Sequence, residues 1–170
     1  MKNPLLFCTL LAAFNLLHLA HGEIEFVYIF KERAFEQYGN MAPTAPWQWV
    51  FGAGVEGDNQ VTGGTITYPG SGGPVNLLGG DGEYELDITG YTAQSFLDND
   101  YPNGNYTLKV TDNNVIQTLG PVSIDGDAYP VIPHILNAQG LQSHDLSQNY
   151  TLKWKSFAGS TPDDEMLLQI

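Results

Sequence analysis

The acidic run Asp98-Asn99-Asp100 and the turn after it are the residues best suited to chemistry in this chain. Carboxylate and amide oxygens suit Ca²⁺, and an EF-hand loop places them at alternating positions with glycine at the sixth. Here Asn103 and Gly104 come one residue late, and no glutamate stands where the bidentate ligand belongs. Asp98 and Asp100 are therefore the candidate metal ligands of an irregular calcium site. The alternative is a turn whose carboxylates bond their own backbone, and no other cofactor is expected.

Three aromatic residues are candidates for binding a ligand by stacking. Trp47 and Trp49 share one face of an expected strand with Phe51, because side chains alternate along a strand. Tyr101 opens the turn that leads to Gly104. The Trp47–Phe51 stripe favours a layer of the core. If the rings are exposed, however, Trp47, Trp49 and Tyr101 would stack on sugars, as in a carbohydrate-binding module.

Signatures of catalysis are missing from the sequence. It contains neither the Gly-x-Ser-x-Gly elbow nor the His-Glu-x-x-His zinc motif. Residues 52–57 match Gly-x-Gly-x-x-Gly, but the sequence after them cannot form the helix that would bind a pyrophosphate. We therefore expect a Gly-rich bend that ends a strand. Glu83, Glu85 and Asp87 share one strand face, which is typical of a solvated surface. Glycoside hydrolysis by a pair of carboxylates is the alternative that the sequence leaves open. We predict a protein that is not an enzyme and has no catalytic residues.

The charge of the chain restricts its partners. There are 19 acidic residues against 6 Lys and Arg, a formal net charge of −13. Such a surface repels phosphate backbones and anionic lipid, so we expect no nucleic-acid partner, and anionic membrane surfaces are poor partners. An extracellular protein or a glycan is the expected partner.

The N-terminus has the pattern of a secretory signal peptide. Lys2 precedes an apolar run from Leu5 to Ala20, and Ala20-His21-Gly22 places small residues at the cleavage site. We predict that residues 1–22 are removed, that the protein is secreted or held at the cell surface, and that no membrane insertion follows cleavage. A membrane anchor fits less well because the run is short for a span. Lipid attachment at Cys8 fits less well because the bulky Phe7 precedes it.

The elements that would position these residues are mostly strands. Alternation of apolar and polar residues, bounded by Gly, Pro and Asn clusters, predicts strands at 23–31, 47–55, 60–68, 75–78, 83–89, 106–110 and 116–124. One or two helical turns are expected over Thr92–Asp98, with Thr92 as N-cap. The turn-rich segment 125–130 predicts a boundary between a β-sandwich domain, 23–127, and a second module, 128–170. Strands are expected in that module at 131–136, 149–157 and 166–170.

Two stretches resemble known families. The Pro130-x-x-Pro133 entry, the strand ending in Trp154 and the segment 166–170 resemble the first strands of a fibronectin type III or similar immunoglobulin-like module. Residues 101–110 resemble the Pro-x-Gly-x-Tyr-x-Leu-x-Val strand of exported bacterial β-sandwich repeats. The resemblance implies an all-β protein, an immunoglobulin-like β-sandwich followed by a partial, three-strand fibronectin type III-like module. It also implies adhesion, spacing or surface display.

The second module is expected to be incomplete, because three strands are too few to close a sandwich. A truncated sequence is the favoured explanation. In the alternatives, the tail completes the sheet of the first module, or a partner does so.

Overall fold

The chain folds into two antiparallel sheets, so the predicted all-β class is confirmed. The computed structural model describes residues 7–12, 24–126, 129, 131–145, 147–156 and 165–169. Sheet A has the strand order β10-β1-β2-β3-β7-β6, and sheet B has the order β5-β4-β8-β9. The elements are β1 (Phe7–Ala12), β2 (Ile24–Glu36), β3 (Gln48–Gly57), β4 (Val61–Thr67), β5 (Val75–Asn76), β6 (Leu78–Gly80), β7 (Glu83–Tyr91), α1 (Gln94–Asp100), β8 (Gly104–Asp112), β9 (Val115–Ile124), α2 (Ala138–Leu141) and β10 (Glu165–Gln169).

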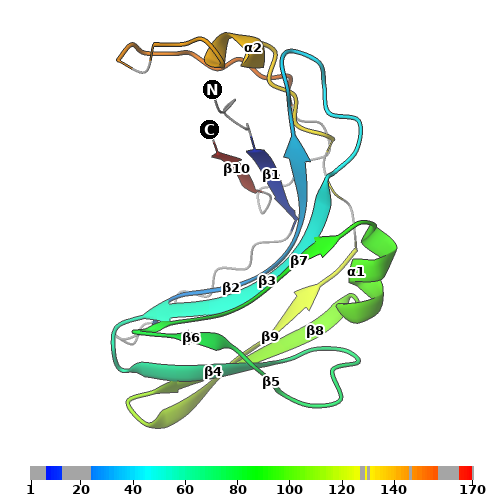
Figure 1. Cartoon of the computed structure of the whole chain (residues 1–170). Coiled ribbons are helices and arrows are strands. Elements are labelled where there is room, and N and C mark those ends of the chain that lie inside the picture. Colours follow the sequence, from blue (N-terminus) through cyan, green and yellow to red (C-terminus); the bar gives the residue numbers. More distant parts are fainter. Residues whose placement is uncertain are drawn as a thin grey trace.

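The molecule has the shape of a crescent. Figure 1 shows the two sheets packed face to face in one half, while β2 and β3 continue beyond them and curve toward β1, β10 and α2. Long paired strands curve in this way because each strand carries a right-handed twist. The concave side of the crescent is therefore the outer surface of sheet A, which is turned away from sheet B.

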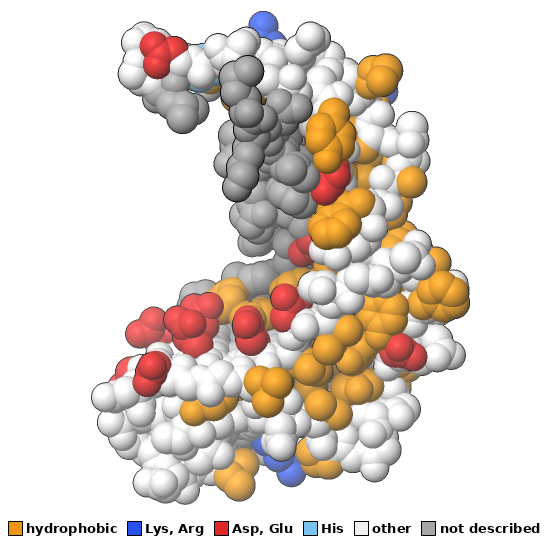
Figure 2. Space-filling view, viewed as in Figure 1, with side chains coloured by type: hydrophobic (Ala, Val, Ile, Leu, Met, Phe, Trp, Pro, Cys, Tyr) orange, Lys and Arg blue, Asp and Glu red, His pale blue; other side chains and the backbone are white. Residues whose placement is uncertain are grey.

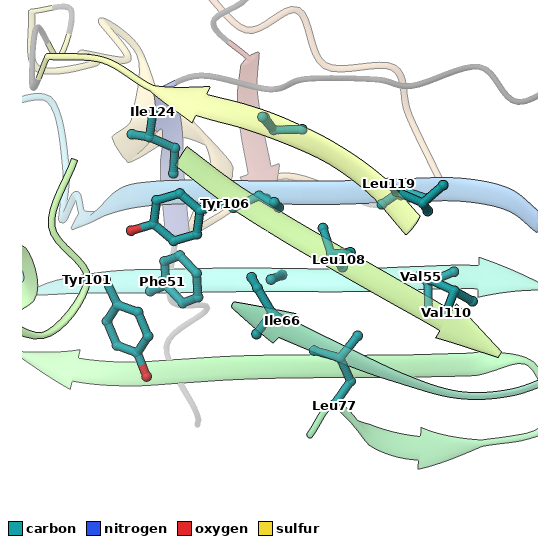
Figure 3. Packing of buried hydrophobic residues seen from close by; sticks show 14 of the residues in the cluster. Phe51, Val55, Ile66, Leu77, Tyr101, Tyr106, Leu108, Val110, Leu119 and Ile124 are labelled. Carbon is teal, nitrogen blue, oxygen red and sulfur yellow. The ribbon is translucent and has the colours of Figure 1, made fainter. Parts of the chain in front are cut away.

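The core lies between the two sheets and is built by strict alternation. Tyr106, Leu108 and Val110 of β8 are fully buried, as the period-two pattern predicts. Phe51 of β3 points into the same layer, and its ring stacks on that of Tyr101 with centroids 4.0 Å apart and planes 6° apart (Figure 3). Full burial of each such side chain contributes roughly 1.5–3 kcal/mol, so this layer holds the sandwich together.

The helix expected near residue 92 forms, but its start differs from the prediction. α1 begins at Gln94, and its N-cap is Ala93 in an extended conformation with no side-chain cap bond. Thr92 is therefore not the N-cap. Burial of Leu97, which is 0% exposed, fixes the helix against the core in place of a cap. No described helix is both long and apolar enough to cross a membrane.

The strands predicted at 131–136 and 149–157 are not formed in the described part of these segments. The residues make only an isolated bridge between Ile135 and Trp154, and the indole of Trp154 is 49% exposed. The predicted three-strand module is wrong in this respect. The third predicted strand exists as β10, but it pairs with β1 in sheet A, so the tail joins the main sheet.

Side chains replace the missing ladder in this segment. The amide of Gln37, 4% exposed, accepts a hydrogen bond from Ile135 N at 2.9 Å and donates one to Ile135 O at 2.6 Å. Asn137 donates to Thr151 O and accepts from Lys153 N. Because these amides satisfy the backbone groups, the segment is held beside Gln37, the residue that follows β2, without forming a sheet of its own.

The predicted division at residue 127 stays a prediction. Ile135 and Ala138 form a small cluster with Leu141 and Leu152, separate from the main core. Tyr129, beyond the boundary, packs against the main core instead. Within the predicted signal peptide, β1 pairs with β2 on one side and with β10 on the other.

Candidate functional site

The outer face of sheet A carries a column of aromatic side chains on β2. Phe26, Tyr28 and Phe30 alternate with the buried core residues Val27 and Ile29, so they lie on the side away from sheet B. The Phe26 and Tyr28 rings have centroids 5.7 Å apart. The Tyr28 and Phe30 rings are also 5.7 Å apart, with their planes only 24° apart. Tyr28 and Phe30 thus present two nearly parallel, partly exposed rings.

Two glycines of β3 leave room for the Tyr28 and Phe30 rings to lie against the sheet. Gly54 pairs directly with Tyr28, and Gly52 pairs with Phe30. A Cβ atom added at either glycine would collide with the ring of its partner. The rings therefore lie across the bare backbone of β3. The Gly-x-Gly-x-x-Gly segment was expected to be a bend ending a strand; instead it is the interior and end of β3, and its first two glycines are the floor under the rings.

A column of carboxylates on β7 borders the aromatic floor. Because Gly54 has no side chain, the hydroxyl of Tyr28 reaches across β3 and donates a hydrogen bond to Glu85 Oε2 at 3.2 Å. Figure 2 shows acidic side chains gathered in a row on the concave side of the crescent. The register places three rows across β2, β3 and β7: Phe26–Glu56–Glu83, Tyr28–Gly54–Glu85 and Phe30–Gly52–Asp87.

The carboxylate charges help to raise the pKa values of Tyr28 and Asp87. Burial raises the pKa of the Tyr28 hydroxyl, and the charges of Glu85, Glu56 and Asp87 raise it further. Burial and the charge of Glu85 raise the pKa of Asp87. The outer face of sheet A is therefore strongly electronegative here. We call this surface the platform, and it consists of Phe26, Tyr28, Phe30, Glu32, Gly52, Gly54, Glu56, Glu83, Glu85 and Asp87.

Glu32 is the exceptional carboxylate of the platform. It follows Phe30 by two residues on β2 and so lies on the same outer face. Its side chain is 8% exposed, yet no hydrogen bond or ion pair joins it to any described residue. Burial, and then the charge of Asp87, raises its pKa to about 7. Ionising a carboxylate in such a poorly solvated place is costly, and groups with shifted pKa values gather at functional sites.

The predicted metal ligands have other partners. Asp98 Oδ1 lies 2.7 Å from Nζ of Lys31, whose side chain is 1% exposed. Asp100 accepts hydrogen bonds from the Tyr91 hydroxyl at 2.7 Å and from Asn99, and these bonds lower its pKa. The Lys31 ammonium thus supplies the positive charge beside Asp98, while calcium binding stays a prediction. No group of three or more His, Cys, Asp or Glu among the described residues could hold a metal ion.

The predicted stacking residues do not gather into one surface. Trp49 is 8% exposed and packs edge-on against Tyr129, with centroids 5.1 Å apart. Tyr101 is also 8% exposed, beneath Phe51. Only Trp47 of the three is exposed, at 47%. The expected core layer therefore holds for Trp49 and Phe51, and sugar stacking at the three residues stays a prediction.

The platform was not predicted from the sequence, although its parts are visible there. The aromatic alternation at 26–30, the glycine alternation at 52–54 and the acidic alternation at 83–87 each have period two. Period-two spacing shows that the members of each set share a face. It does not show that the three sets share one face of the same sheet, which depends on strand order and register.

Comparison with protein-family models, with curated proteins and with solved structures finds no match.

Proposed function

We propose that this chain is a non-enzymatic extracellular β-sandwich protein that adheres to glycans through the platform on sheet A. The observation that carries the proposal is the pair of partly exposed Tyr28 and Phe30 rings, whose planes are 24° apart and which are bordered by carboxylates. The apolar C–H face of a sugar ring stacks on such a surface, because aromatic rings offer a large, rigid contact area. Carboxylates alongside accept hydrogen bonds from the sugar hydroxyls.

The framework supports an adhesive or display role. Two antiparallel sheets packed over one core are the architecture of immunoglobulin-like sandwiches. In addition, the Tyr106 hydroxyl donates to Pro102 O at 2.7 Å, and a tyrosine that bonds backbone a few residues upstream is a feature of those domains. We propose an immunoglobulin-like sandwich on these grounds, to which residues 165–169 contribute the edge strand β10 of sheet A.

Export supports an extracellular glycan as the partner. The signal-peptide pattern of residues 1–22 supports secretion or display at the cell surface. Cleavage after Gly22 would remove β1. This strand lies between β10 and the Lys31–Glu36 half of β2, so both would lose their pairing partner on that side. The three rows of Phe26, Tyr28 and Phe30 lie on β2, β3 and β7. Glu32 is the member of the platform that pairs with β1, opposite Leu11.

Substitution of a floor glycine tests the proposal. We expect Gly54→Ala to force the Tyr28 ring off the sheet and to lower glycan affinity at least about tenfold, which corresponds to about 1.4 kcal/mol. The matched control is Gly63→Ala on β4, where an added Cβ meets no atom within 4 Å. The measurement is a glycan-array screen with the full chain and both variants, followed by titration calorimetry with the glycans that bind.

Two results would contradict the proposed function. The first is an array on which the unmodified chain binds no glycan. The second is a glycan bound equally well by the unmodified chain, by Gly54→Ala and by Gly63→Ala. Circular dichroism of both variants serves to check that they are folded. A loss of affinity in a folded variant then reports on the platform.

A further inference from the structure

We propose that the platform selects amine-bearing glycans, that is, polymers containing glucosamine units whose ammonium groups pair with Glu32 and the carboxylates of β7. This inference rests on the proposed glycan-binding function and narrows it to one ligand class. Stacking on Tyr28 and Phe30 holds the sugar rings, and the carboxylates recognise the positive charges.

Glu32 is the first observation behind this choice. Its carboxylate is 8% exposed, faces the platform and has no partner among the described residues. A neutral sugar hydroxyl would give it one hydrogen bond but would leave a negative charge in a poorly solvated place. A ligand ammonium would satisfy the hydrogen-bonding capacity and the charge together, and such charge-assisted bonds are roughly twice as strong as neutral ones.

Uncompensated repulsion between carboxylates is the second observation. The charges of Glu85, Glu56 and Asp87 all act on Tyr28, and that of Asp87 also acts on Glu32. None of these carboxylates forms an ion pair within the described part of the chain. A cationic ligand would relieve the repulsion, so binding it is favoured over binding a neutral one.

The spacing of the groups favours an extended polymer. Glu83, Glu85 and Asp87 stand at every second residue of β7, so they spread over about 13 Å at roughly 3.3 Å per residue. The aromatic column of β2 runs beside them with the same period. A chain of sugar rings that carries regularly repeated ammonium groups meets both columns at once. A lysine-rich peptide would meet the charges but would have no flat ring to place on Tyr28 and Phe30.

Calorimetric titration of the full chain with matched hexasaccharides tests the inference. The probes are a glucosamine hexamer, its fully N-acetylated form, a glucose hexamer and, for charge alone, hexalysine. Each is titrated at a series of pH values from mildly acidic to neutral, because the sugar amines must be protonated while Glu32, with its pKa raised to about 7, must be ionised. We expect the glucosamine hexamer to bind at least about tenfold more tightly than the other three. Glu32→Gln should lower the affinity for the glucosamine hexamer at least about tenfold, because it removes one partner of a desolvated charge pair. The matched control, Glu25→Gln, removes an exposed charge from the same strand and should leave that affinity unchanged.

The outcomes separate this inference from the function on which it rests. Equal affinity for the three sugar hexamers would overturn selection for amines and leave glycan binding intact. Binding of no sugar hexamer would overturn both. Hexalysine binding as tight as that of the glucosamine hexamer, and unaffected by Tyr28→Ala, would show that charge alone is recognised and would also overturn the inference.

Discussion

Replacing Lys31 with methionine is expected to lower the free energy of unfolding by about 3 kcal/mol, the lower end of the range for breaking a buried ion pair. Lys31 is 1% exposed and pairs with Asp98 at 2.7 Å, and it also donates to Asn103 Oδ1 at 3.0 Å. These contacts tie β2 to α1 and to the turn before β8. The loss is at the lower end because Asp98, 27% exposed, regains some water when its partner is removed.

The measurement is urea unfolding of the full chain, with Lys109→Met as the matched control. Lys109 stands on β8 and is exposed, so the same chemical change there should cost no more than about 0.5 kcal/mol. A double-mutant cycle with Asp98→Asn isolates the coupling between the two side chains. Equal stability of the Lys31 and Lys109 variants would show that the buried pair does not hold α1 in place.

Replacing Glu32 with glutamine is expected to stabilise the protein progressively as the pH rises. The pKa of Glu32 is raised from 4.5 to about 7 in the folded protein, so between these values the folded state binds more protons than the unfolded state. The stability of the unmodified protein therefore falls as the pH rises from about 4.5 to 7. Because the glutamine variant lacks this titration, the difference between the two proteins should change by about 3 kcal/mol in favour of the variant, at about 1.4 kcal/mol per pKa unit.

Urea unfolding at a series of pH values from about 4 to 8 measures this difference. Asp87 titrates in both proteins, so its contribution to the pH dependence of the free energy of unfolding cancels to first order in the difference. The Glu25→Gln variant controls for the change in net charge. A difference that does not vary with pH would mean that Glu32 is solvated or paired in solution. That result would remove the main reason for assigning it to a cationic ligand.

Much of the fold could be predicted from the sequence because it follows local rules. Tyr106, Leu108 and Val110 alternate with polar residues, and they are buried as the alternation requires. The acidic face of β7 was recognised as a single surface for the same reason. These predictions rest on the direction in which successive side chains point, which is a property of any strand.

The platform and the tail could not be predicted because they depend on contacts between distant residues. Gln37 pairs with the backbone of Ile135, 98 positions away, and no periodicity within 131–136 reveals that a side chain replaces a strand there. Likewise, Gly54 looks like a turn former in isolation. Its purpose follows only from the register that sets it opposite Tyr28.

The central claim is that a glycan binds across β2, β3 and β7 on the concave side of the molecule. Its most direct test is a map of backbone amide NMR shifts as the glucosamine hexamer is added to the full chain. We expect the largest shifts on Gly52, Gly54 and residues 83–87. Shifts centred on the exposed indoles of Trp47 or Trp154 instead would contradict it.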